Sequence, residues 1–200
     1  MATPTPCRAG TPTRRVEANS RLTGLAGGAL FLLLALEGAT VIGVRRLLAA
    51  HLFIGLLLVP PVLLKMATTG YRFVRYYAGD FDYRAAGPPA LLLRLVAPAV
   101  VVSTVVVFAS GIELWLFGYK FGDQWLGLHK LSFVVWFFAT AVHVLGHLKR
   151  APRLIQADFV GTLPGAITRR SLLGASLVLG LVLAFTTILW PVPSVALGER

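Results

Sequence analysis

The chain has 200 residues, of which 56% are hydrophobic and only 14% are charged, and its mean hydropathy is +0.77. This composition is typical of integral membrane proteins and excludes an ordinary water-soluble domain. The single cysteine, Cys7, excludes an internal disulfide and a cysteine-ligated iron–sulfur cluster within this chain. The formal net charge of +11 reflects membrane topology in our interpretation, and we expect no nucleic-acid partner.

The first 21 residues are rich in Thr, Pro and Arg and lack the apolar segment of a signal peptide, which predicts a disordered tail. Five continuous apolar segments follow, each long enough to cross a hydrocarbon layer of about 30 Å. They are residues 22–44, 47–66, 91–117, 126–148 and 172–190. Continuous apolar runs predict helices and not the alternating strands of a β-barrel. We therefore expect an all-α integral membrane bundle of five transmembrane helices.

Local features divide the chain further. Pro60 and Pro61 predict a kink near the middle of the second span. Residues 71–89 mix aromatic and basic side chains, as interfacial segments do. We assign residues 22–149 to one four-helix bundle and 150–170 to a loop with a short amphipathic stretch at 154–160. Residues 171–200 would form the fifth helix and a short outer tail.

Basic residues indicate the orientation. If the N-terminus is cytoplasmic, most of the 19 Lys and Arg residues lie on the cytoplasmic side. The remainder are Arg45, Arg46, Lys120, Lys130 and Arg200. The positive-inside rule favours this topology, and the high Arg, Ala, Leu and Gly usage suggests a bacterial inner-membrane protein.

Two spans carry matching polar pairs at the same spacing. His51 and Lys65 lie 14 residues apart in the second span, and His129 and His143 lie 14 apart in the fourth. Fourteen residues fall about 40° short of four turns and rise about 21 Å, so each pair shares one helix face at two membrane depths. Because both spans run outside to inside, His51 and His129 share an outer level. Lys65 and His143 share an inner level.

Small residues repeat this spacing on the other two core spans. Gly24 and Gly38 lie 14 residues apart in the first span, and Ala97 and Gly111 lie 14 apart in the third. These spans run the other way, which places Gly38 and Gly111 at the outer level and Gly24 and Ala97 at the inner level. Small residues let a flat ligand approach a helix closely. The combined pattern indicates a bundle that binds haem.

This pattern resembles the four-helix, two-haem core of the cytochrome b superfamily, including the quinone-linked b-type subunits of bacterial respiratory reductases. In that family, histidines 14 apart on the second and fourth helices bind two haems, and glycines 14 apart lie on the first and third. The resemblance covers residues 22–149. It implies that His51 and His129 ligate an outer haem b and that His143 ligates an inner one.

The resemblance also implies a function in electron transfer. Such a subunit passes electrons between the quinone pool and a redox partner protein, and it is not a stand-alone enzyme. The bis-imidazole iron that this family uses is six-coordinate and low-spin, which suits electron transfer better than oxygen binding.

Lys65 departs from the family pattern, because it stands where the fourth histidine is expected. A neutral lysine can ligate iron, and burial favours the neutral amine. Alternatively, the inner haem is absent and Lys65 extends to the headgroups. His147 does not replace the missing ligand, because it lies on the same helix as His143. The sequence therefore leaves open whether the chain binds one haem or two.

Glu37, Glu113 and His147 add further candidates. Glu37 and Glu113 reach the level of His51 and His129, and these four side chains suit a non-haem metal ion. The glutamates are otherwise proton carriers at a quinone site, together with His147, or partners of Arg45 and Arg46. Two rival functions remain: a cofactor-free membrane protein held together by its polar side chains, and a membrane Glu/His metal protein.

Overall fold

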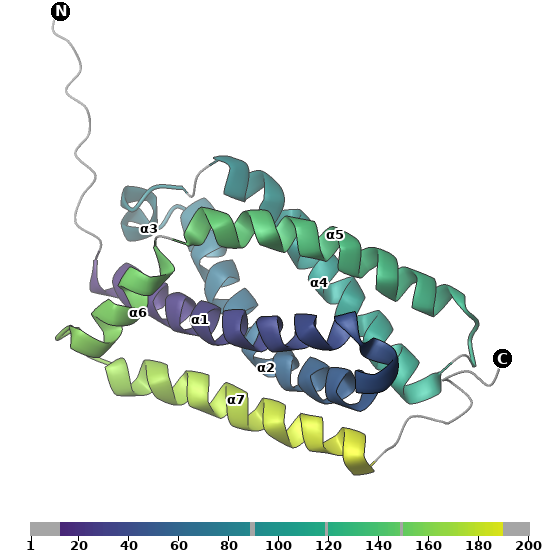
Figure 1. Cartoon of the computed structure of the whole chain (residues 1–200). Helices are drawn as coiled ribbons and strands as arrows, with labels where there is room; N and C mark the ends of the chain where they lie inside the picture. Colours follow the sequence, from purple (N-terminus) through teal and green to yellow (C-terminus); the bar gives the residue numbers. More distant parts are fainter. Residues whose placement is uncertain (1–12, 89–90, 119, 149, 190–200) are drawn as a thin grey trace, which may run out of the picture.

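The computed structural model describes residues 13–88, 91–118, 120–148 and 150–189. These residues form α1 (Arg14–Ile42), α2 (Val44–Tyr77), α3 (Phe81–Ala85), α4 (Leu91–Phe117), α5 (Gln124–His147), α6 (Ala151–Val160) and α7 (Ala166–Leu189). Helices α1, α2, α4, α5 and α7 are long and apolar enough to cross a membrane. The predicted all-α bundle of five transmembrane helices is confirmed (Figure 1). The chain is a multi-pass membrane protein whose apolar helix faces contact lipid.

The first helix begins earlier than the sequence predicted. Residues 14–21, assigned to a disordered tail, are the first turns of α1. They are fixed by long-range hydrogen bonds: Asn19 Nδ2 donates to the Thr68 carbonyl at 3.1 Å, and Arg21 Nη1 donates to the Ala157 carbonyl at 2.6 Å. The remainder of the predicted tail, residues 1–12, lies outside the described residues. The polar composition of these residues by itself predicts disorder, because the hydrogen-bond partners Thr68 and Ala157 are distant in the sequence.

The other boundaries differ for similar reasons. Residues 71–77 of the predicted interfacial segment continue α2. The predicted loop 150–170 contains α6, which includes the amphipathic stretch, and the start of α7. Helix α2 runs through Pro60 and Pro61, and its non-helical backbone lies at Leu47 (φ −109°, ψ 18°), close to the turn from α1.

The spanning helices form two groups. Helix α2 packs closely on both α1 and α7, and α4 packs closely on α5. The close backbone neighbour of α5 is α4, whereas α4 approaches α2 at few positions. In Figure 1, α5 and α7 lie on opposite sides of α1. Side chains from the two groups therefore meet in the space that α1, α2, α4 and α5 surround.

A glycine allows α7 to touch the backbone of α2. A Cβ atom built at Gly180 would lie well inside contact distance of the Leu57 carbonyl oxygen. Such close approach of helix backbones is a common use of glycine in membrane proteins. Gly180 therefore fixes the distance between the two helices.

A buried ion cluster attaches α6 to α7. The Asp158 side chain is fully buried, and Arg169 Nε donates to Asp158 Oδ1 at 2.6 Å. Arg170 Nε donates to Asp158 Oδ2 at 3.2 Å, and its Nη2 donates to the Asp158 carbonyl at 2.6 Å. Two guanidinium groups thus compensate the charge of one buried carboxylate.

We predict that Gly180→Ala lowers the thermal stability of the detergent-solubilised protein. The added methyl group would meet the Leu57 carbonyl, and overpacking of this kind costs about 1–3 kcal/mol. The matched control is Gly174→Ala on the same helix, where a Cβ has no neighbour within 4 Å. Equal melting temperatures for the two variants would contradict the close α2–α7 contact.

We also predict that Asp158→Asn destabilises the protein by about 3–5 kcal/mol, because it leaves the buried Arg169 cation without its counter-charge. The exposed Asp123→Asn is the control, and it should leave the melting temperature unchanged. Thermal unfolding monitored by circular dichroism measures both. Similar curves for the two variants would refute a structural role for the cluster.

Candidate functional site

The structure brings together five polar side chains near the α1–α2 turn, which we call the outer cluster: Glu37, Thr40, His51, Ser110 and His129. All four core helices contribute to it. The short turn at Gly43 makes α1 and α2 antiparallel, so that Glu37 on α1 faces His51 on α2. Ser110 on α4 faces His129 on α5 in the same way.

His51 is bound through Nδ1. This nitrogen lies 2.8 Å from Glu37 Oε1 and 3.1 Å from Thr40 Oγ1. The Thr40 hydroxyl donates to the Glu37 carbonyl oxygen at 2.6 Å, so its lone pairs face the imidazole. A carboxylate that accepts from Nδ1 places the ring hydrogen there and leaves the lone pair of the neutral ring on Nε2.

His129 is bound in the same manner but by neutral groups. Its Nδ1 lies 3.0 Å from the Val107 carbonyl oxygen and 3.1 Å from Ser110 Oγ. Because a carbonyl oxygen only accepts, the hydrogen of His129 is on Nδ1. The lone pair of its neutral ring is therefore also on Nε2.

The two imidazoles face each other across the bundle. Their ring centroids are 6.3 Å apart, and the ring planes are inclined by 84°. Within the described residues, neither Nε2 atom has a hydrogen-bond partner. A metal–imidazole bond is about 2 Å long. Two such bonds, with about 1 Å from each nitrogen to its ring centre, require a centroid separation of about 6 Å. The observed separation of 6.3 Å is close to this value.

The two outer-level glycines have different surroundings. A Cβ at Gly111 would lie 3.0 Å from His129 Cε1, so the His129 ring itself needs a glycine there. A Cβ at Gly38 would have no neighbour within 4 Å. Gly38 is exposed at the surface of the described helices and contacts neither imidazole.

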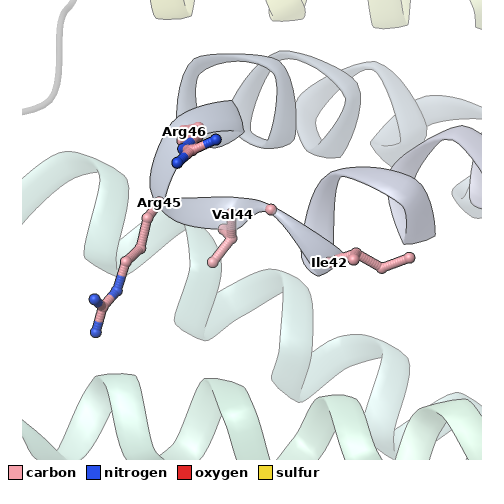
Figure 2. Close-up of a pocket in the computed structure, with 5 residues that line it drawn as sticks. Ile42, Val44, Arg45 and Arg46 are labelled. Carbon is pink, nitrogen blue, oxygen red and sulfur yellow. The ribbon is translucent and has the colours of Figure 1, made fainter.

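The two glutamates, Glu37 and Glu113, have different surroundings in the structure. Glu37 joins His51, whereas both carboxylate oxygens of Glu113 are buried and have no hydrogen-bond partner among the described residues. Neither glutamate forms an ion pair with Arg45 or Arg46 in the described part of the chain. These arginines line a shallow hollow at the α1–α2 turn and point in different directions (Figure 2).

The alternative of a Glu/His metal site finds no support in this arrangement. In the described ranges, no group of three or more His, Cys, Asp or Glu side chains is placed to hold a metal ion. The carboxylate of Glu37 is directed at the Nδ1 atom of His51, where it orients the ring. Glu37 is thus a partner of a candidate ligand in this structure.

The inner level is built differently. Lys65 Nζ donates to the Thr23 carbonyl oxygen at 2.7 Å, and a Cβ at Gly27 would lie 3.0 Å from this nitrogen. Gly24, which the sequence assigned to this place, faces α6 instead, since its Cβ would lie 2.9 Å from Leu154 Cβ. Ala97 is partly buried on α4. Gly27 therefore takes the position expected for Gly24.

His143 and His147 contact each other and not a facing imidazole. Their ring centroids are 4.7 Å apart, and His143 Nδ1 is buried without a hydrogen-bond partner in the described residues. Both rings project from α5, so they do not offer ligands from opposite sides. With Lys65 bonded to Thr23, the inner level lacks the opposed pair that the outer level has.

Sequence reasoning missed Thr40, Ser110 and the Val107 carbonyl. Thr40 and Ser110 are buried polar residues in membrane spans, and each lies within three residues of a predicted site residue, Glu37 or Gly111. Polar side chains at such positions are costly unless they bond to something, and this signal was available. The backbone carbonyl leaves no signal in the sequence.

Comparison of the chain with protein-family models, curated proteins and solved structures found no match.

We predict that Gly111→Ala displaces the His129 ring by a few tenths of an ångström, because the new Cβ would lie 3.0 Å from Cε1. The control is Gly127→Ala on α5, where a Cβ has open space. Because the chain has four histidines, the NMR spectrum of histidine-labelled protein contains few imidazole signals. These signals can be compared between the wild type and the two variants. An unmoved His129 signal in Gly111→Ala would rule out the contact.

Proposed function

We propose that this protein is a membrane b-type cytochrome in which His51 and His129 hold one haem b at the outer level. The observation that carries the proposal is the opposed imidazole pair, with a centroid separation of 6.3 Å and both Nδ1 atoms bonded to protein. Histidine ligands of metals almost always donate their other ring N–H to a carboxylate or carbonyl.

The residues of the outer cluster would prepare both imidazoles in advance. Glu37 and Val107 fix the tautomer, so each neutral ring presents the Nε2 lone pair. Thr40 and Ser110 add second hydrogen bonds that limit rotation of the rings. The iron of a bound haem supplies the one-electron chemistry, which a bis-imidazole site favours over oxygen binding.

Electron transfer in the membrane requires a donor and an acceptor. We infer that the protein passes electrons between the quinone pool and a redox partner protein of a respiratory chain. Buried and unbonded, Glu113 is a candidate proton carrier for a quinone reaction, as is His147 near the other end of the bundle. As a subunit of an oxidoreductase, the chain would conduct electrons and need not catalyse net chemistry.

The charge distribution supports an orientation for this subunit. The end that contains α3 and α6 carries most of the arginines, among them Arg72, Arg75, Arg153, Arg169 and Arg170. By the positive-inside rule this end is cytoplasmic, together with the N-terminus. The outer cluster would then lie toward the periplasm of a bacterial inner membrane.

We expect one haem per chain, because Lys65 is bonded to Thr23 and His143 has no facing imidazole. Two haems per chain would make Lys65 the second ligand of the inner one. A protein without haem would favour the cofactor-free alternative, in which the Glu37–His51 bond only joins α1 to α2.

We predict that the purified protein shows a Soret band and a sharp α-band in its reduced-minus-oxidised spectrum, and that His51→Ala and His129→Ala each abolish or strongly reduce haem content. Each substitution removes one imidazole that would hold the haem. The control is His147→Ala, which removes a membrane histidine outside the opposed pair and should retain the wild-type haem content.

The measurement is haem per polypeptide together with the optical spectrum, on protein expressed with ample haem. Absence of the Soret band in the wild type would refute the proposal. Equal loss of haem in all three variants would show that the effect reports general instability and not ligation.

A further inference from the structure

The two candidate ligands have unequal partners. The Nδ1 atom of His51 faces a carboxylate, 2.8 Å from Glu37 Oε1. The Nδ1 atom of His129 faces a neutral carbonyl and a neutral hydroxyl, from Val107 and Ser110. The hydrogen-bond distances are similar, so the main difference between the two sides is the charge.

Glu37 is held in this orientation. Its side chain is 15% exposed, and Thr40 Oγ1 lies 3.3 Å from its second oxygen, Oε2. Thr40 itself is buried and is bonded to the Glu37 backbone. Among the described residues, His51 is the one ion-pair partner of Glu37. No Lys or Arg there neutralises the carboxylate, so its charge acts on the imidazole.

We propose that Glu37 is a positioning residue that lowers the reduction potential of the haem held by His51 and His129, by bonding its carboxylate to His51 Nδ1. This inference rests on the proposed function. An anionic acceptor at Nδ1 makes the imidazole a stronger electron donor, which stabilises ferric iron over ferrous iron. The effect is enhanced in the low-dielectric interior of a membrane protein, where charges interact strongly.

The electron balance of the affected step is simple. One electron from the reductant converts ferric to ferrous iron, and no bond forms or breaks in the protein. The negative charge of Glu37 opposes the added electron, whereas the neutral partners of His129 do not. The asymmetry between the two ligands therefore locates the control of the potential on the α1–α2 side.

The test is a redox titration of Glu37→Gln in the full-length, haem-loaded protein, with dithionite as reductant. Glutamine keeps the length of the side chain and an oxygen that accepts from His51 Nδ1, but it removes the charge. We expect the ratio of ferrous to ferric haem at a given ambient potential to rise at least tenfold. For a one-electron couple this corresponds to a rise in the reduction potential of about 59 mV.

The matched control is Ser110→Ala, which removes a neutral partner of His129 and leaves its bond to the Val107 carbonyl. Its potential should move by only a small fraction of the change in Glu37→Gln. If Glu37 acts in packing alone, Glu37→Gln changes haem retention or stability and leaves the potential at the wild-type value.

The outcomes separate this inference from the proposed function. If neither the wild-type protein nor any variant binds haem, the proposed function is refuted. If Glu37→Gln binds haem and its potential equals or falls below the wild-type value, the inference alone is overturned. If Glu37→Gln does not retain haem, Glu37→Asp decides. It keeps the charge but withdraws it from Nδ1, so its potential must rise, and an unchanged potential would overturn the inference.

Discussion

The outer cluster depends on a constraint that lipid places on every polar side chain in a membrane span. Hydrocarbon offers no hydrogen bonds, so a polar group must find its partner inside the protein or lose several kcal/mol, on the order of the cost of burying an unpaired amide. His51 and His129 meet this requirement at Nδ1, through Glu37, Thr40, Ser110 and the Val107 carbonyl. Their Nε2 atoms have no hydrogen-bond partner among the described residues. The fold thus satisfies the Nδ1 side of each imidazole and leaves the Nε2 side without a described partner.

The arrangement of helices serves this geometry. The α1–α2 pair carries His51 with its acidic partner, and the α4–α5 pair carries His129 with its neutral partners. Each histidine is therefore oriented by the helix that packs directly against its own. A bond from Trp136 Nε1 to Thr104 Oγ1, 3.0 Å long, strengthens the α4–α5 pair about two helical turns from His129. The separation of the rings then depends only on how the two helix pairs approach each other.

Much of the fold could be predicted from the sequence, because hydropathy in lipid reports spans directly. The first residue of α1 could not be predicted, because Asn19 and Arg21 are polar and their hydrogen-bond partners, Thr68 and Ala157, are distant in the sequence. The 14-residue spacing identified His51 and His129 as neighbours because helical periodicity fixes both depth and face. It failed for Gly24, which packs on Leu154 of α6, a helix whose position no spacing within the spans reveals. The same limit applies to Lys65, whose amine bonds to a backbone carbonyl.

The division into two helix groups also has a consequence for biogenesis. Helices α1, α2 and α7 pack on one another, as do α4 and α5, while few backbone contacts join the two groups. The α4–α5 pair can pack as soon as both of its helices are in the bilayer, whereas the α1–α2–α7 group is complete only when α7, which follows α5 in the chain, has been inserted. The outer cluster draws its residues from both groups, so it forms only when the two groups have come together.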